Sequence, residues 1–298
     1  MVNAVRKNPV RGNLQDKDKP PVDAYLFIPY FDGDIGSRPL PTGIIFYLCP
    51  NILVNGVAYK GVPLQKGQTF DLSIKICNFG TKVARNVVAR IYWANPTVGF
   101  LRSQIADNII AQMQIPVIQT GTTITTTTTP WEITDRIPDH VCLLAEVTNI
   151  QDPAPNGIDV ALDRHFAQQN LNVIKVTPGQ KVLFPLQIAQ VTDNNLKFKI
   201  QTRPVKGIQL EMLAREIEAR PSEIIARDIQ LHTYGNIPLT GKQRLSELGR
   251  AEVETCELEF AIPENVAPGE FVAVEVIRTD EKNLDKLVGG MVVVAIVG

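Results

Sequence analysis

Residues 68–100 read QTFDLSIKICNFGTKVARNVVARIYWANPTVGF and predict two strands joined by a turn. Apolar and polar side chains alternate in residues 70–76 and again in residues 87–93. A period of two places one face of a strand in a core and the other face in water. Between the strands, Gly80 can adopt the positive φ that a tight reversal requires. We expect Trp93 to be a large apolar anchor in the middle of a two-sheet sandwich.

The residues around this pair of strands add further strands and few helices. Asn55-Gly56 separates two short apolar runs and predicts a two-residue hairpin. The threonine run 125–129 favours extended backbone, because a branched Cβ restricts χ1. Such a run is compatible with an ice-binding or a glycosylated surface, but without a repeated motif we favour a single edge strand. Residues 103–113 predict a short helix, and residues 210–219 show the clearest helical period of the chain.

A second module is predicted after Pro178-Gly179, where alternating strands resume. The last of them, Val288 to Val297, is the most apolar run of the chain and is about half as long as a membrane span, so we expect a final buried strand. The predicted fold is therefore all-β, with two tandem immunoglobulin-like antiparallel β-sandwiches, an N-terminal extension and a minor helix. The predicted division is residues 1–43, 44–177 and 178–298.

Four segments, taken in order, resemble the bacterial cell-adhesion-related domains of immunoglobulin type known as CARDB-like. The segments are NFGTKVARNVVARIYWANPTVGF, PWEI, DHVCLLAEV and DRHFAQQNLNV, and the resemblance covers roughly residues 66–176. It implies a β-sandwich that serves as a spacer, an adhesin or an assembly module. Cys77 and Cys142 fall on strands where immunoglobulin domains place their bridging pair, although Cys77 is out of phase with the apolar face of its strand. A disulfide between them and two free thiols both remain open.

The N-terminal residues predict an arm followed by an apolar docking segment. Residues 1–22 are mildly basic and poor in apolar side chains, so they are either a disordered terminus or an arm that orders against a neighbouring subunit. Residues 22–41 are too apolar to remain in water. We expect four of their aromatic side chains to contact another subunit: Tyr25, Phe27, Tyr30 and Phe31.

Charge and hydropathy exclude several classes of partner. Lys plus Arg total 30 and Asp plus Glu total 31, for a net charge of −1, so nothing draws the whole chain toward nucleic acid. No apolar run approaches the ~18 residues of a membrane span, and membrane insertion is not expected. The first residues contain no apolar h-region of a signal peptide. Localisation stays open between the cytoplasm and export by a non-classical route.

The sequence offers no catalytic constellation, and we predict no enzyme, cofactor or metal. There is no G-x-S-x-G and no phosphate-binding glycine motif; residues 235–242 resemble one superficially, without the strand and helix it needs. The three histidines lie on separate segments. Asp163-Arg164-His165 could form a metal or acid–base cluster, but a solvated loop is favoured. Asp32-Gly33-Asp34 could begin a calcium loop, but a polar turn is favoured because the further ligands are absent.

These observations favour a non-enzymatic structural or adhesion-type protein. It would associate with copies of itself or with another protein through its arm and its sheet edges, as a repeating subunit of a larger bacterial assembly. The alternative is a carbohydrate-binding β-sandwich module, since such modules use exposed aromatic side chains. The candidates for that role are Tyr92, Phe100 and Trp131.

Overall fold

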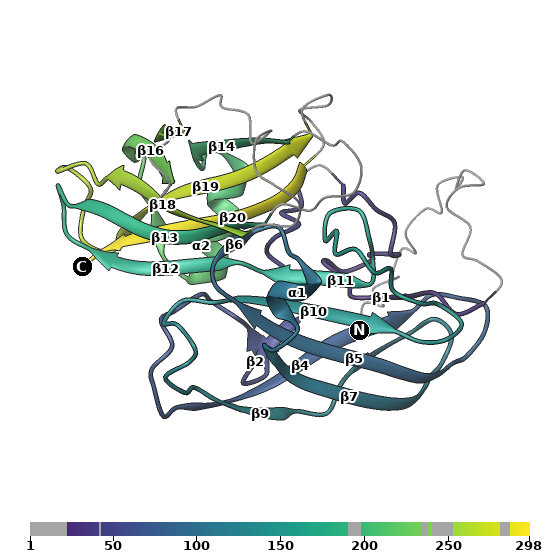
Figure 1. Cartoon of the computed structure of the whole chain (residues 1–298). Helices are drawn as coiled ribbons and strands as arrows, with labels where there is room; N and C mark the ends of the chain where they lie inside the picture. Colours follow the sequence, from purple (N-terminus) through teal and green to yellow (C-terminus); the bar gives the residue numbers. More distant parts are fainter. Residues whose placement is uncertain (1–22, 42, 190–197, 234–237, 240–252, 281–286) are drawn as a thin grey trace, which may run out of the picture.

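The computed structural model describes residues 23–41, 43–189, 198–233, 238–239, 253–280 and 287–298. Over these residues the chain consists of β-strands with two short helices, which confirms the predicted all-β class (Figure 1). The strands form two modules, each made of two sheets.

The first module is built around β4 (Thr69–Asn78), the long strand of the opening sequence stretch. On one side β4 pairs with β1 (Leu26–Phe27) and β2 (Ile52–Val54), and β3 (Val57–Ala58) pairs in turn with β2. On the other side β4 pairs with β8 (Thr122–Thr125) and β9 (Thr129–Glu132). The facing sheet has the order β11 (Phe166–Gln169), β10 (Cys142–Thr148), β5 (Ala84–Ala94) and β7 (Ile109–Ile118).

The predicted alternation in β4 and β5 is confirmed by burial. One face of each strand is fully buried in the same hydrophobic cluster: Leu72, Ile74, Ile76, Val87, Ala89 and Ile91. The Asn55-Gly56 hairpin is also confirmed, because β2 and β3 pair through Val54 and Val57. The threonine run lies on the outer side of β4, where β8 and β9 occupy an edge of the sheet.

Two expectations about the opening stretch were wrong. Trp93 is only partly buried, whereas Tyr92 is buried, because the register of β5 against β7 shifts between Ile91 and Tyr92. A bulge of this kind reverses the facing of the side chains that follow it. Gly80 does not adopt a positive φ. It is needed for space instead: a Cβ there would lie 2.1 Å from the main-chain oxygen of Asp23.

The helix predicted over residues 103–113 is mostly a strand. Only Arg102–Ile105 is helical (α1), and β7 begins at Ile109. Ala111 and Met113 are buried while Gln112 and Gln114 are exposed, which is the alternation of a strand. An isolated helix of this length is marginal, and pairing with β5 satisfies the main chain instead. The second predicted helix is confirmed as α2 (Ile208–Ile217).

The second module also has two sheets, and both contain parallel pairs. One has the order β12 (Leu171–Val176), β20 (Leu287–Val297), β19 (Glu270–Asp280) and β14 (Phe198–Pro204), with β15 (Arg220–Pro221) beside β19. The other has the order β17 (Pro238–Leu239), β16 (Arg227–Thr233), β18 (Val253–Ala261), β13 (Lys181–Ala189) and β6 (Thr97–Val98). The expectation of a wholly antiparallel module is corrected, because β12–β20, β6–β13 and β15–β19 are parallel.

The chain passes between the modules earlier than the sequence indicated. We expected the boundary after residue 177, but β12 already pairs with β20, so the crossing lies at Asn170 between β11 and β12. In addition, β6 leaves the first module and pairs with β13 of the second. The predicted boundary rested on a Pro-Gly turn, which here is only the turn between β12 and β13.

The two modules share a core. Val272, Val274 and Val276 of β19 point into the cluster of the second module. Phe271 and Ala273, on the opposite face of β19, belong to the cluster that contains the first module's core. A sheet that is buried on both faces reads as a continuous apolar run, which explains the composition of β19 and β20. In Figure 1 the second module lies directly on the first, with β6 reaching between them.

Candidate functional site

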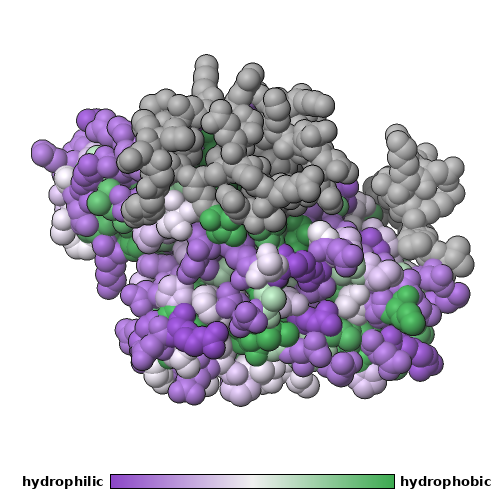
Figure 2. Space-filling view, in the orientation of Figure 1, coloured by the Kyte–Doolittle hydropathy of each residue, from purple (hydrophilic) through white to green (hydrophobic). Residues whose placement is uncertain are grey.

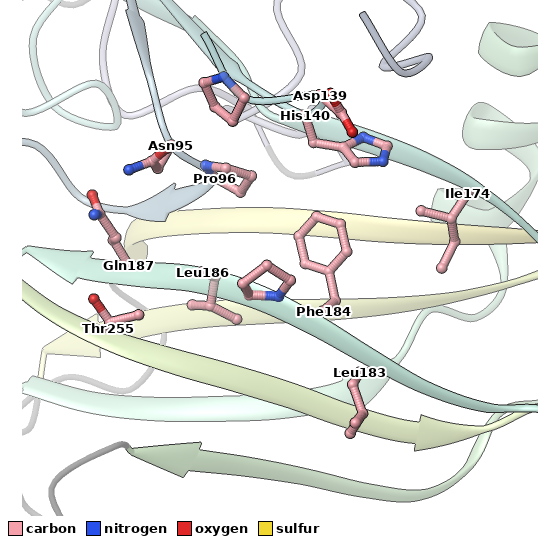
Figure 3. A pocket seen from close by; sticks show the side chains of 12 residues that line it. Asn95, Pro96, Asp139, His140, Ile174, Leu183, Phe184, Leu186, Gln187 and Thr255 are labelled. Carbon is pink, nitrogen blue, oxygen red and sulfur yellow. The ribbon is translucent and has the colours of Figure 1, made fainter. Parts of the chain in front are cut away.

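A groove lies where β13 faces the first module, and its cavity volume is about 480 Å³ (Figure 3). One wall is the edge of β13, and the other comes from the loop before β10 and the turn before β6. Ile174 of β12 and Thr255 of β18 also contribute. The residues that line the groove are Asn95, Pro96, Pro138, Asp139, His140, Ile174, Leu183, Phe184, Pro185, Leu186, Gln187 and Thr255.

The groove exists because β13 is only half covered on one side. Along one edge β13 pairs with β18 over its full length. Along the other edge β6 pairs only with Gln187 and Ile188. Among the described residues, no strand pairs with the rest of that edge. The edge of β13 between Leu183 and Leu186 therefore faces the groove on that side.

The direction of one hydrogen bond fixes which main-chain groups are open. The N–H of Gln187 donates to the carbonyl of Pro96 at 2.7 Å, so the main chain of Gln187 faces β6. Main-chain groups alternate sides along a strand. Leu183 and Pro185 therefore present their main chain to the groove, with the difference that Pro185 has no N–H to donate.

The floor of the groove is apolar. Phe184 and Leu186 are buried, while the side chain of Leu183 is 52% exposed at the rim. The His140 ring lies edge-on to Phe184, with ring centroids 5.5 Å apart, as Figure 3 shows. Burial lowers the pKa of His140 despite the nearby Asp139 and a hydrogen bond with the main chain of Gly61. His140 is therefore neutral at pH 7, and the groove presents no charged group at its floor.

Charged and polar side chains surround the rim. Lys181 pairs with Glu259 at 2.8 Å, and Asp139 lies 3.8 Å from Lys66 with its side chain 72% exposed. Gln187 accepts a hydrogen bond from Gln104 of the first module at 2.8 Å. On the face shown in Figure 2, hydrophobic residues form small separate groups among hydrophilic ones. A half-open apolar groove with a polar rim thus differs from the general surface.

The predicted subunit-contact residues are divided between the core and the surface. Phe27 and Tyr30 are buried within the chain's own core, because β1 pairs with β4 and the Tyr30 hydroxyl donates to the carbonyl of Phe46 at 2.6 Å. Tyr25 and Phe31 are partly exposed. A contact with another subunit thus stays a prediction for Tyr25 and Phe31, whose side chains are accessible. The arm itself (residues 1–22) lies outside the described residues.

The loop after β10 brings together a histidine and two carboxylates. His165, only 2% exposed, has Nδ1 2.8 Å from Asp163 and Nε2 3.2 Å from Asp152. Burial alone would lower the pKa of His165, but the contacts with Asp152 and Asp163 outweigh burial and raise it. Asp152 also accepts the main-chain N–H of Leu26 at 2.6 Å and pairs with Arg164 at 2.5 Å. The cluster therefore fastens β1 to the first module.

The sequence flagged residues 163–165 but missed Asp152, which reaches the cluster from elsewhere in the loop. Among the described residues, no group of three or more His, Cys, Asp or Glu could hold a metal ion. In the Asp32-Gly33-Asp34 turn, the Asp34 carboxylate pairs with Arg38 at 3.2 Å and accepts the N–H of Tyr30 at 2.9 Å. A polar turn is therefore the correct interpretation of that segment. The phosphate-motif-like residues 235–242 lie largely outside the described residues.

The candidate residues of the alternative functions are in the core. Tyr92, Phe100 and Trp131 are at most 7% exposed, so none of the three can stack on a sugar. Cys77 and Cys142 are buried free thiols, as are Cys49 and Cys256. Cys77 lies on the face of β4 opposite to Ile76, which explains why it does not reach Cys142 across the sandwich. The part of the chain that the structure describes contains no helix long and apolar enough to cross a membrane.

Sequence reasoning missed the groove, although one signal was present. Pro185 interrupts an otherwise regular alternating strand. Proline lacks the N–H that a central strand must donate, so within sheets it marks an edge. The lining from the first module has no such signal, because Pro96 and His140 are distant from β13 in sequence.

Comparisons with known proteins identify no family. No family model matches the chain, and no curated protein matches it. Among solved structures, it is similar to the CupB6 tip adhesin from Pseudomonas aeruginosa, with 10% identity and a TM-score of 0.21, covering 88% of this chain and 97% of that chain. It is also similar to red sea bream transglutaminase, with 10% identity and a TM-score of 0.17, covering 83% of this chain and 31% of that chain. At these TM-scores neither similarity carries an argument about function, and the CARDB-like resemblance stays a prediction.

Proposed function

We propose that this chain is a non-enzymatic structural protein of adhesion type that associates with copies of itself through its sheet edges. The observation that carries the proposal is the open edge of β13, which lies in an apolar groove between the modules. Natural β proteins usually cover or charge an edge of this kind, because it pairs with other chains. An edge left open beside apolar side chains supports a role in protein association.

Two further features support assembly over catalysis. The ionisable groups that the structure brings together are paired with each other: the buried Glu146 pairs with the half-exposed Arg102, and the buried His165 lies between two aspartates. They hold loops and strands in place, and none of them lines the groove beside β13. Tyr25 and Phe31, partly exposed near the arm, add a second surface suited to a contact between copies.

Sedimentation velocity of the full chain over a wide concentration range tests the proposal. We expect the average sedimentation coefficient to rise with concentration, and negative-stain images at high concentration to show rings or filaments. A chain that sediments as a monomer at every concentration, with single particles in the images, would contradict self-association. Binding to a glycan array, which none of the buried aromatic residues predicts, would favour the carbohydrate-binding alternative.

A further inference from the structure

We propose that the groove binds an extended polypeptide segment as an additional strand beside β13, and that residues 1–22 of a second copy supply this segment. The inference rests on the proposed self-association and names its contact. It concerns a groove with two walls: β13 forms one, and residues 95–96 and 138–140 of the first module form the other. Such a groove has room for a single extended chain. The edge strand of a second sheet would not fit, because the strands beside it would collide with the far wall.

The main chain of β13 points to a peptide rather than a small molecule. Leu183 and Pro185 direct their carbonyls toward the groove, and Leu183 also directs an N–H there. Main-chain groups at a strand edge are satisfied by water or by another strand, and a ligand that covers them must replace those hydrogen bonds. An extended peptide does so residue by residue, as in β-strand addition. Pro185 has no main-chain N–H, so the added strand receives no hydrogen bond from β13 at that position.

The side chains of the groove define the sequence that it would take. Phe184, Ile174 and the neutral His140 form the floor, so a charged side chain directed inward would remain unpaired. The volume of about 480 Å³ lies within the usual range of ligand pockets. Leu183 at the rim would be covered by the added strand. The groove therefore selects small or medium apolar side chains on the inward face of the segment.

Residues 1–22 match these requirements. Their first residues, Val2 to Val5, are uncharged and mainly apolar. The segment contains five basic residues (Arg6, Lys7, Arg11, Lys17 and Lys19) and two acidic ones (Asp16 and Asp18), for a net charge of +3. At about 3.3–3.6 Å per residue, the segment spans at most roughly 75 Å when fully extended.

The rim of the groove is complementary in charge. It carries the exposed carboxylate of Asp139, which lies 3.8 Å from Lys66. The outer face of β18 next to it carries Glu257 and Glu259, and Glu259 pairs with Lys181, so the carboxylates outnumber the lysines. A basic segment that leaves the groove would pass over these carboxylates. Because of these carboxylates, we expect a neutral or acidic segment to bind less well than a basic one.

Two substitutions at exposed leucine and isoleucine side chains test the assignment in the full chain. Leu183→Asp places a charge at the rim of the groove, while Ile208→Asp changes a side chain that is 67% exposed at the start of α2, outside the groove lining. We expect Leu183→Asp to weaken association by at least about tenfold and Ile208→Asp to leave it unchanged. If Leu183→Asp associates as the wild type does, the groove assignment is overturned while self-association stands. A wild-type chain that is monomeric throughout would overturn both.

A synthetic peptide of residues 1–14 provides a second test that does not depend on a folded variant. In excess, it should compete with the arm and lower association of the full chain. Two versions, N-methylated at complementary alternate residues of Val2 to Val5, separate strand addition from simple hydrophobic binding. Only the version methylated on the side facing β13 should lose the competition. Equal competition by both versions, or none by the unmodified peptide, would refute strand addition by residues 1–22.

Discussion

Single residues connect parts of this chain that are far apart in sequence, and His165 does so through charge. It lies between Asp152 and Asp163, with Arg164 beside them, and Asp152 holds the main chain of Leu26. The raised pKa of His165 means that its stabilising effect is complete below the unfolded-state pKa of about 6.5 and is lost as pH rises through the folded-state value. Burial alone would raise the pKa values of both aspartates, but the hydrogen bonds and positive charges around them, from His165 and Arg164 above all, together lower these pKa values. The contribution of the aspartates is therefore lost only in strong acid.

We therefore predict that His165→Gln destabilises the chain most between about pH 4 and pH 6.5. The expected loss there is about 2 kcal/mol, because Gln cannot supply the charge between the two carboxylates. Above the raised pKa, the wild type also has a neutral ring, so the difference should shrink. Thermal unfolding midpoints measured from pH 4 to pH 9 check this. A deficit for His165→Gln that is constant over the range would refute the charged role.

At the residue scale, the sequence predicted which side chains are buried better than it predicted which distant residues they contact. The alternation in β4 and β5 predicted which side chains are buried, because burial on one face is a local consequence of strand geometry. Asp152 and the lining from residues 138–140 were not predictable, since each acts through a partner that only the folded chain brings near. For the same reason the sequence did not predict that Tyr92, and not Trp93, is buried in the core: the bulge that turns Tyr92 inward depends on the register of β5 with β7.

At the scale of elements, short turns decide which strands pair. The β2–β3 hairpin turns through Asn55 and Gly56, whose φ values are +52° and +82°. This is the two-residue turn that suits the twist of paired strands. Asn55 also donates its N–H to the carbonyl of Asp71 at 2.7 Å and accepts the N–H of Asp71 on its side chain at 2.8 Å. The turn therefore positions β2 against β4. By contrast, residues 103–113 had no turn signal, and their pairing with β5 overrode a helical pattern.

We predict that Gly56→Ala destabilises the chain by about 1 kcal/mol. A Cβ at Gly56 would contact nothing within 4 Å, so the cost is that of forcing a non-glycine residue to a positive φ. Gly56→Asn should recover most of the loss, because asparagine tolerates this conformation. Chemical denaturation with urea would measure both variants. Equal losses for Ala and Asn would show that something other than the backbone conformation is responsible.

The whole molecule depends on the face of β19 and β20 that packs against the first module. Tyr47 of the first module donates its hydroxyl to the buried carboxylate of Glu275 at 2.5 Å. The carbonyl of Gly290 accepts hydrogen bonds from Gln168 at 2.9 Å and Asn170 at 3.1 Å. Because the two modules share one core, we expect them to unfold together. The groove beside β13 lies at the same junction, so its walls keep their spacing only while the modules stay in contact.

Gly290 tests this dependence directly. A Cβ on Gly290 would lie 2.3 Å from the Tyr47 ring, which cannot move away while its hydroxyl remains bonded to Glu275. We predict that Gly290→Ala costs about 2 kcal/mol and splits one calorimetric transition into two, as the modules lose their contact. Gly157→Ala is the matched control, because a Cβ there meets nothing within 4 Å and its φ is not positive. A Gly290→Ala chain that unfolds in one transition at the midpoint of the control would show that the modules do not depend on this contact. Two transitions together with weaker self-association would connect the junction to the groove that it encloses.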